Sequence, residues 1–338
     1  MRHYAGKSRI SVPIALLLLA VGGIPVLWNY PQLYARVLED RRFPALSRYA
    51  LEPVPEVALV GSSMMFRIYE GYFRSPLRNV AISGGSSLTG LAIIASYPKL
   101  PRVIVVETNI LSRPINAALV EKFGNNDAEP FAWFRPNRVA ISWVYYWLKY
   151  KSESDNVAML PRQPPSSYDI KASLDETEAE YANPDSAALM AENAEALQRL
   201  VAELEGRGSS VYFVELPYPG TLGQSHYAVT ARALAHKAFP DRSKWPAIDY
   251  HLSELRWVDA SHMDERSAIV VAQQIDDFLR RPTTAKTPSQ ACVRHAPRAN
   301  CRILNPGEQV GDETARRDQN VRLADTAFDR GRAADLDP

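Results

Sequence analysis

The sequence predicts an α/β protein built on a doubly wound, mostly parallel sheet with helices on both faces. Two patterns predict it: short apolar, β-prone runs recur along the middle of the chain, and helical stretches alternate with them. The 338 residues, 46% of them hydrophobic, suffice for one large or two small domains, and no internal repeat is visible. A formal net charge of +1, with no basic cluster interleaved with aromatics, excludes nucleic acid as a partner.

Four apolar runs are the expected strands. They are residues 57–60, 79–82, 103–107 and 211–216. The first stops at Gly61, as a buried parallel strand would, and the third is the clearest because four valines or isoleucines precede Glu107. The expected helices are 87–97, 186–205, 225–239 and 264–281. The second of these closes on Gly206 and Gly208, which suits a helix end.

The N-terminus carries an uncharged apolar run from Ile10 to Trp28, preceded by Arg2, Lys7 and Arg9. Its length is close to the ~20 residues that cross a bilayer as a helix. We therefore expect residues 1–30 to form a cytoplasmic tip and a transmembrane anchor in inner-membrane lipid, with residues 31–55 as a linker. A large domain that follows such an anchor is usually exported, which predicts a periplasmic location. A cleaved signal peptide and a buried core helix are the alternatives.

The C-terminal stretch, residues 282–338, has the opposite character. It is rich in Arg, Asp, Ala, Thr and Pro and poor in large apolar residues, so it is expected to be a disordered tail. Both cysteines, Cys292 and Cys301, lie in it. They could close a small loop in an oxidising compartment, but ligands for a metal site are not nearby.

Residues 131–150 interrupt the alternation with a dense set of aromatic side chains. These are Phe131, Trp133, Phe134, Trp143, Tyr145, Tyr146, Trp147 and Tyr150. One interpretation is a lid or groove wall that stacks on sugar rings, and another is a surface that rests on the membrane. The structural alternative is an aromatic helix packed on the core. The polar, proline-containing stretch 152–183 suggests a surface excursion, so we expect an insertion over residues 123–185.

Candidate catalytic residues follow the expected strands or open the last helix. Ser63 follows the first strand and is the candidate nucleophile. His262 is the candidate base, and Asp259, three residues earlier, could fix its tautomer. The N–H of Gly84 and the side chain of Asn109 follow the next two strands and could stabilise an oxyanion. Taken in this order, the residues indicate serine-dependent acyl chemistry.

Two alternatives stay open at this point. The Gly61-Ser62-Ser63 turn offers two serines, of which the register favours Ser63, and Asp249-x-His251 is a second Asp–His pair. No glycine-rich phosphate loop accompanies them, because the Gly84 turn lacks the lysine of a P-loop and the third glycine of a dinucleotide fingerprint. The sequence therefore predicts no cofactor.

These blocks resemble the SGNH, or GDSL-type, hydrolase superfamily of esterases, lipases and carbohydrate O-acyltransferases. Gly61-Ser62-Ser63 matches the family's Gly-Asp-Ser turn with serine in the middle place, and Asn79 to Gly84 resembles the block whose glycine N–H faces the oxyanion. Glu107-Thr108-Asn109-Ile110 matches Gly-x-Asn-Asp only at the asparagine, whereas Asp259 to His262 meets Asp-x-x-His in full. The resemblance implies a flavodoxin-like SGNH domain over residues 56–281.

The resemblance also implies a function. Membrane-anchored relatives that acylate exopolysaccharides or cell-wall polymers show similarly relaxed blocks, so we expect acyl ester hydrolysis or O-acyl transfer, above all of acetyl, on an extracytoplasmic glycan. Transfer would require a multispanning membrane protein that delivers the acyl group. The alternative is a non-catalytic, glycan-binding accessory subunit of an envelope polysaccharide assembly.

Overall fold

The computed structural model describes residues 26–125, 131–150, 154–182, 184 and 186–281. All of them belong to one compact unit, which ends at Pro282. The expected anchor lies outside the described residues except for its last few positions, and residues 26–29 there are helical. The expected tail, with Cys292 and Cys301, lies outside them altogether.

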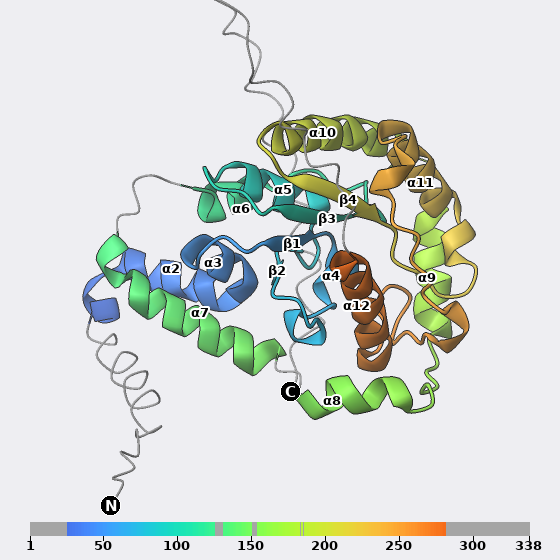
Figure 1. The fold of residues 1–338 in the computed structure, drawn as a ribbon, viewed down its shortest axis with the longest axis horizontal. Coiled ribbons are helices and arrows are strands. Elements are labelled where there is room, and N and C mark those ends of the chain that lie inside the picture. Colours follow the sequence, from blue (N-terminus) through green and yellow to red (C-terminus); the bar gives the residue numbers. More distant parts are fainter. Residues whose placement is uncertain (1–25, 126–130, 151–153, 183, 185, 282–338) are drawn as a thin grey trace, which may run out of the picture. The chain divides into compact units, whose positions relative to one another are not determined.

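The centre of this unit is a four-stranded, all-parallel sheet, as the sequence predicts (Figure 1). Its strands are β1 (Val57–Val60), β2 (Arg78–Asn79), β3 (Val103–Glu107) and β4 (Ser210–Val214), in the spatial order β2-β1-β3-β4. In register, Ala58 of β1 lies opposite Arg78 on one side and Ile104 on the other. Because each β1 and β3 residue is buried, the apolar runs that predict these strands are also what holds the sheet between its helices.

Strand β2 is shorter than the expected run 79–82. The chain still follows β1 beyond Asn79, since the N–H of Val80 donates to Leu59 O (2.8 Å) and that of Ile82 donates to Gly61 O (3.1 Å). The N–H of Ala81 instead donates to the side-chain oxygen of Asn79 (2.9 Å). Since β2 is the edge strand and the N–H of Ala81 points away from β1, Asn79 supplies a partner for a group that has no neighbouring strand.

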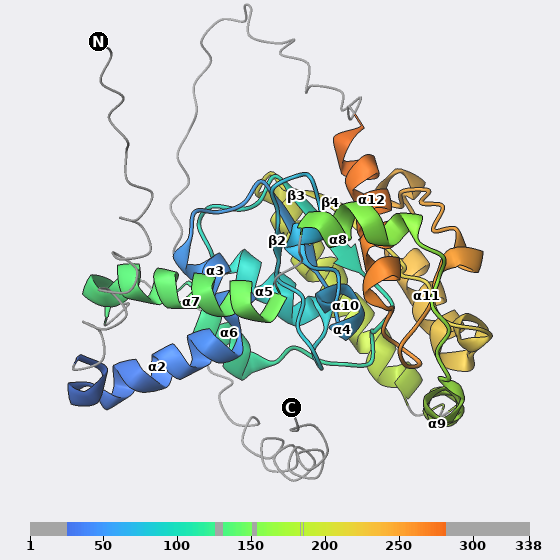
Figure 2. The ribbon, with the colours of Figure 1, turned by 90° about the horizontal axis from the view of Figure 1, so that it is seen from below.

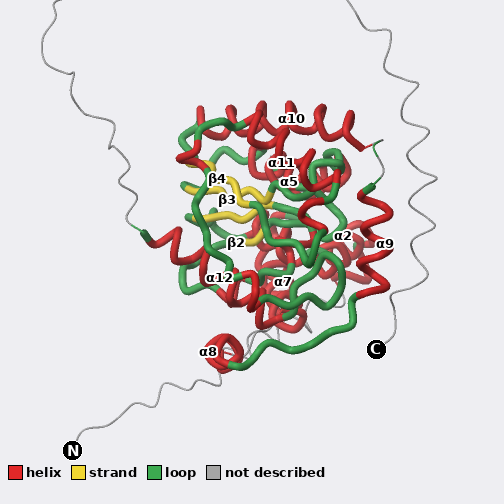
Figure 3. The backbone as a smooth tube through the Cα atoms, turned by 90° about the vertical axis from the view of Figure 1, so that its right-hand side faces the viewer, coloured by secondary structure: helices red, strands yellow, loops and turns green. Residues whose placement is uncertain are grey.

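Two apolar clusters cover the two faces of the sheet. Side chains of Val60, Val106 and Phe213 enter the cluster beneath α5 (Ser87–Ala95), α10 (Ser186–Gly206) and α11 (His226–Ala238). Alternate strand residues, Leu59 and Val105 among them, enter the opposite cluster with α4 (Ser63–Phe66) and α12 (Glu265–Arg280). Figure 3 shows the strands between these helical layers. The expected parallel sheet with helices on both faces is confirmed. The bounds of α5, α10, α11 and α12 agree with the expected ones within a few residues, whereas α4 was not expected.

Residues 31–55 are largely helical, and the linker predicted there from the sequence is wrong. They form α2 (Pro31–Arg42) and α3 (Pro44–Leu51), each with a proline in its first turn, where its missing N–H is not needed. Both helices pack against α7 (Arg135–Tyr150) (Figure 2). The three helices are joined by a buried ion pair: Arg138 Nε and Nη2 donate to Asp40 (2.6 and 3.0 Å), and Ser47 Oγ donates to the same carboxylate (2.9 Å).

The expected insertion, residues 123–185, is largely helical in its described parts, with an irregular stretch at 163–170. It contains α7, α8 (Ser154–Met159) and α9 (Lys171–Tyr181), and α6 (Ala117–Phe123) precedes it. Short 3-10 turns complete the fold at Glu70–Tyr72, Ala132–Phe134, Leu160–Arg162, Leu222–Gln224, Arg242–Lys244 and Leu252–Glu254. None of the helices in the described ranges is both long enough and apolar enough to cross a bilayer.

Candidate active site

The strand order creates a topological switch point at the carboxyl ends of β1 and β3. The chain leaves β1 toward β2 on one side of the sheet and later continues from β3 toward β4 on the other. Ligands of open α/β sheets bind at such a switch point, outside the strand ends. The residues that follow these two strands are Gly61-Ser62-Ser63 and Thr108-Asn109, and two of the candidate catalytic residues are among them.

The turn after β1 is tightly packed, and its two serines have different surroundings. A Cβ on Gly61 would lie 2.6 Å from Met65 Cβ and 2.7 Å from Glu107 Oε2, so only glycine fits there. Ser62 is buried and caps α4, with its hydroxyl accepting a hydrogen bond from the N–H of Met64 (3.2 Å). Ser63 opens α4 and is half-buried. The structure therefore favours Ser63 over Ser62 as the accessible hydroxyl.

Glu107 lies directly beneath this turn and is buried. Its Oε2 accepts a hydrogen bond from the N–H of Ser62 (2.6 Å), and its Oε1 accepts one from the N–H of Ile110 (3.2 Å). Burial raises the pKa of the Glu107 carboxyl, against the opposing effect of these hydrogen bonds. In the sequence, Glu107 is only a departure from the family's glycine, whereas the structure shows that it joins the end of β3 to the serine turn.

The two candidate oxyanion donors have different surroundings. Asn109 is buried, and its side-chain amide forms two hydrogen bonds with the backbone of Leu216. Nδ2 donates to Leu216 O (2.8 Å), and Oδ1 accepts from the N–H of Leu216 (2.7 Å). One of the two amide hydrogens of Asn109 is thus used to hold the chain after β4. Gly84 lies in an exposed turn, closed by Gly85 N–H to Ile82 O (2.9 Å), and its φ of +73° favours glycine. Both remain predictions as oxyanion donors.

The Asp259–His262 pair is formed. His262 Nδ1 lies 2.7 Å from Asp259 Oδ2, while Asp259 Oδ1 accepts hydrogen bonds from the N–H groups of Ser261 (2.8 Å) and His262 (2.7 Å). The pair sits at the tip of a small loop, closed by Val258 N–H to His262 O (2.9 Å) and by a bridge between residues 257 and 263. Both side chains are therefore fixed relative to the start of α12.

The electrostatics of the pair suit a base with an orienting carboxylate. Burial would raise the pKa of Asp259, but the hydrogen bonds from His262 and Ser261 outweigh it and lower this pKa to about 2. The carboxylate is thus ionised at neutral pH and would stabilise an imidazolium. His262 Nε2, the nitrogen that would accept a proton, is buried and has no hydrogen-bond partner among the described residues.

The serine and the histidine adjoin elements that lie over the same face of the sheet. Met64, next to Ser63, and Met263, next to His262, belong to the same apolar cluster. Helix α4 lies beside α12 in Figures 1 and 2. No hydrogen bond links Ser63 to His262 in the described part of the chain. In unliganded enzymes such catalytic bonds are often long and tighten only when substrate binds.

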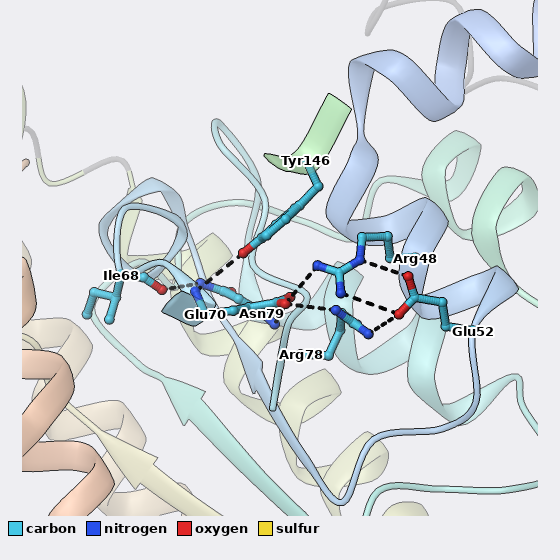
Figure 4. Close-up of polar contacts among 7 residues, drawn as sticks. All are labelled: Arg48, Glu52, Ile68, Glu70, Arg78, Asn79 and Tyr146. Carbon is cyan, nitrogen blue, oxygen red and sulfur yellow. Dashed lines mark hydrogen bonds and ion pairs between the residues drawn. The ribbon is translucent and has the colours of Figure 1, made fainter. Parts of the chain in front are cut away.

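The helix that begins at Ser63 is held from below by Asn79. Its Nδ2 donates to the carbonyl oxygens of Met65 (2.9 Å) and Ile68 (2.8 Å), at the end of α4. The N–H of Asn79 in turn donates to Glu70 Oε1 (3.1 Å) (Figure 4). Asn79 thereby supplies donors for carbonyl groups that a short helix leaves without partners.

Glu70 connects this support to α3 and α7. Its Oε2 accepts from Arg48 Nη1 (2.9 Å) and Arg78 Nη1 (2.7 Å), and both arginines also bind Glu52 (Figure 4). The N–H of Glu70 donates to Tyr146 Oη (3.3 Å), and the Arg48 guanidinium lies 4.4 Å from the centre of the Tyr146 ring. The two arginines and two glutamates balance in charge, so the network can be largely shielded from solvent without a net charge.

The alternative Asp249–His251 pair is a weaker candidate. Its Nδ1···Oδ2 distance is 3.4 Å, and 52% of the His251 side chain is exposed, against 21% for His262. A base so open to water has little means of excluding solvent from a reaction.

Within the described ranges, no group of three His, Cys, Asp or Glu side chains could hold a metal ion.

The comparisons identify no relative from which the function of this site could be assigned. Comparison of the chain with models of known protein families, with curated proteins and with solved structures gave no significant match. The chemistry of the site therefore has to be argued from its own residues.

The structure gives roles to Glu107 and Asn79, which were not assigned a role from the sequence. The sequence nevertheless carries a signal for each of them. A glutamate at the end of a fully buried strand requires hydrogen-bond partners, which marks Glu107. Asn79 opens the second expected strand, where asparagine is disfavoured unless its side chain binds backbone groups. Neither signal names the partner, because the partners lie on other segments of the chain.

Proposed function

We propose that the protein is a serine-dependent acyl ester hydrolase or O-acyltransferase of the SGNH type. Ser63 is the nucleophile, His262 the general base and acid, and Asp259 the group that orients and stabilises His262. The observation that carries the proposal is the Asp259–His262 hydrogen bond of 2.7 Å combined with a buried His262 Nε2 that lacks a partner. The flavodoxin-like strand order, with Ser63 after β1, supports it.

The reaction proceeds in two halves. Ser63 Oγ attacks the ester carbonyl carbon while its proton moves to His262 Nε2, and the resulting oxyanion is stabilised by the Gly84 N–H and by Asn109. The intermediate collapses, the alcohol leaves with the proton from His262, and an acyl ester on Ser63 remains. Water or a sugar hydroxyl then loses its proton to His262 and attacks this ester, and the bond to Ser63 Oγ breaks as His262 returns the proton to that oxygen. Water gives hydrolysis and a sugar gives transfer.

We propose an extracytoplasmic polysaccharide or envelope glycan as the substrate and acetyl as the group moved. The apolar run 10–28 supports a single-pass anchor with the domain on the periplasmic side. An acyl donor delivered through a multispanning membrane partner is consistent with this placement. No cofactor enters the proposed chemistry, since the serine, histidine and aspartate supply nucleophile, base and charge.

The experiment that tests the proposal is labelling of the full chain with a serine-reactive phosphonate. We expect the wild type and Ser62→Ala to be labelled and Ser63→Ala and His262→Ala to be unlabelled, with mass spectrometry placing the adduct on Ser63. Circular dichroism confirms that each variant is folded. Equal labelling of Ser63→Ala and wild type would exclude Ser63 as the nucleophile.

The second candidate is a non-catalytic subunit that binds glycan. It is favoured by the occupied side chain of Asn109, which already binds Leu216 where the family uses it as an oxyanion donor. A folded wild type that resists phosphonate but binds acetylated polysaccharide would support this reading. Labelling that depends on His262 would exclude it.

A further inference from the structure

The α2–α7 layer exposes large apolar side chains from two distant parts of the sequence. They are Trp28, Tyr30, Tyr34 and Leu38 near and on α2, and Trp133, Trp143, Trp147 and Leu148 before and on α7; we call this set the aromatic face. Trp28 is 88% exposed and Leu148 is 63% exposed. Figures 1 and 2 both show α2 and α7 side by side. An exposed apolar surface of this kind marks a contact with a partner or a membrane.

A groove of about 430 Å³ runs between the two helices and continues this surface. Apolar side chains dominate its lining, including Leu27, Ile141 and Val144, and Arg41 is the single charged residue among those that line it. The guanidinium of Arg41 lies 5.2 Å from the centre of the Tyr145 ring. A long cationic side chain beside an apolar groove can reach a polar boundary while its stem stays in apolar surroundings.

Basic residues outnumber acidic ones on α2 and α7. Helix α7 contains no Asp or Glu, and the two acidic residues of α2 are both paired, Glu39 with Lys122 (3.0 Å) and Asp40 with the buried Arg138. Arg41 and Arg42 at the end of α2 are exposed. The surface therefore offers positive charge to an anionic partner, with no unpaired acidic side chain on the two helices to oppose it.

The residue types of the aromatic face, and their position in the chain, indicate which kind of partner binds there. Tryptophan and tyrosine are the side chains enriched at membrane–water interfaces, and basic side chains near them bind anionic headgroups. The apolar run 10–28 ends within the aromatic face, because Leu27 lines the groove and Trp28 is exposed. We propose that the aromatic face rests on the surface of a bilayer containing anionic phospholipid, with Trp143 and Trp147 at headgroup depth. This proposal is independent of the acyl chemistry of Ser63.

The test measures the depth of single positions in the full chain, so that insertion of the N-terminal run alone cannot give a positive result. Cys292 and Cys301 are replaced by Ser, and an environment-sensitive fluorophore is attached at Trp147→Cys. The matched control is Val229→Cys on α11, since Val229 is 48% exposed against 46% for Trp147. Helix α11 lies far from α2 and α7, on the other side of the sheet domain, in both Figures 1 and 2. The chain is reconstituted into vesicles of phosphatidylethanolamine and phosphatidylglycerol that carry a nitroxide lipid.

We expect the label at position 147 to shift to the blue and lose fluorescence to the nitroxide, and the label at 229 to do neither. Trp143→Cys should behave as 147 does. Equal, weak quenching at 147 and 229 in vesicle-bound protein overturns the proposal. A blue shift at 147 that grows with protein concentration and is insensitive to the nitroxide also overturns it and identifies a second copy as the occupant.

The charge requirement is tested separately with Arg41→Gln combined with Arg42→Gln. Each basic side chain near an anionic surface strengthens binding by roughly fivefold. The double variant should therefore lose most of the quenching at 147 in phosphatidylglycerol vesicles, as should wild type in vesicles of phosphatidylcholine alone. Unchanged quenching in both cases refutes the role of anionic headgroups.

Discussion

Replacement of Glu107 by Gln tests how the serine turn is held. In the wild type, one carboxyl oxygen accepts a hydrogen bond from the N–H of Ser62 and the other accepts one from the N–H of Ile110. A glutamine of the same shape has one acceptor oxygen, so one buried N–H is left without a partner, which costs about 1–3 kcal/mol. Glu107→Ala leaves both without one, and by the same reasoning costs about 2–6 kcal/mol.

The penalty should depend on pH in a defined direction. Burial raises the pKa of Glu107 above its ordinary value of 4.5, so the folded protein holds this proton more tightly than the unfolded chain does. The wild type therefore has the full contribution of this carboxyl below pH 4.5 and loses it as the pH rises through the raised pKa. Glutamine does not titrate. The difference in unfolding free energy between wild type and Glu107→Gln should shrink as pH increases above 4.5.

Urea unfolding of the full chain in mild detergent, followed by tryptophan fluorescence at several pH values, measures both effects. The control is Glu203→Gln on α10, an exposed partner of Arg207 whose loss should cost no more than about 1 kcal/mol. The phosphonate labelling rate of Glu107→Gln should also fall, because the turn that presents Ser63 is less fixed. If Glu107→Gln has the same stability, pH profile and labelling rate as the wild type, the role assigned to Glu107 is refuted.

Three further changes have defined outcomes. Asp259→Asn should keep the fold and lower the phosphonate labelling rate by roughly 10⁴-fold, as loss of the orienting carboxylate does in serine triads. Asp40→Ala should reduce unfolding free energy by about 3–5 kcal/mol in urea titrations, because it leaves Arg138 buried and uncompensated, whereas Asp40→Leu with Arg138→Met should restore most of it. Gly84→Ala should cost about 1–2 kcal/mol through its positive φ alone, since no atom lies near the added methyl group. Gly206→Ala, equally unobstructed and in a helix, should not destabilise.

The sheet and its main helices could be predicted because their signals are local. Val103–Glu107 is apolar at every position but the last, and such a run is compatible with few structures other than a buried strand. The amphipathic stretch that became α10 ends at Gly206, one residue beyond the expected helix. Asp259 and His262 are three residues apart, so their contact also required only a local turn.

What the sequence did not reveal depends on contacts between distant segments. Residues 31–55 contain helix-start signals in Pro31 and Pro44, yet their packing on α7 involves the pairing of Asp40 with Arg138, 98 positions away. The partner of Glu107 is likewise 45 positions earlier. Spacing alone cannot pair such groups, because any buried carboxylate requires a partner and the sequence offers many.

The Asp40–Arg138 pair also determines where this chain can be shortened. Removal of residues before 26 leaves α2, α3 and α7 with all their mutual contacts. Removal up to residue 55, the boundary that the sequence alone suggests, would take away the carboxylate and leave the Arg138 guanidinium charged at the newly exposed side of α7, together with Phe134. Soluble fragments for biochemistry should therefore begin ahead of α2, and limited proteolysis should cut before Pro31 rather than between α3 and β1.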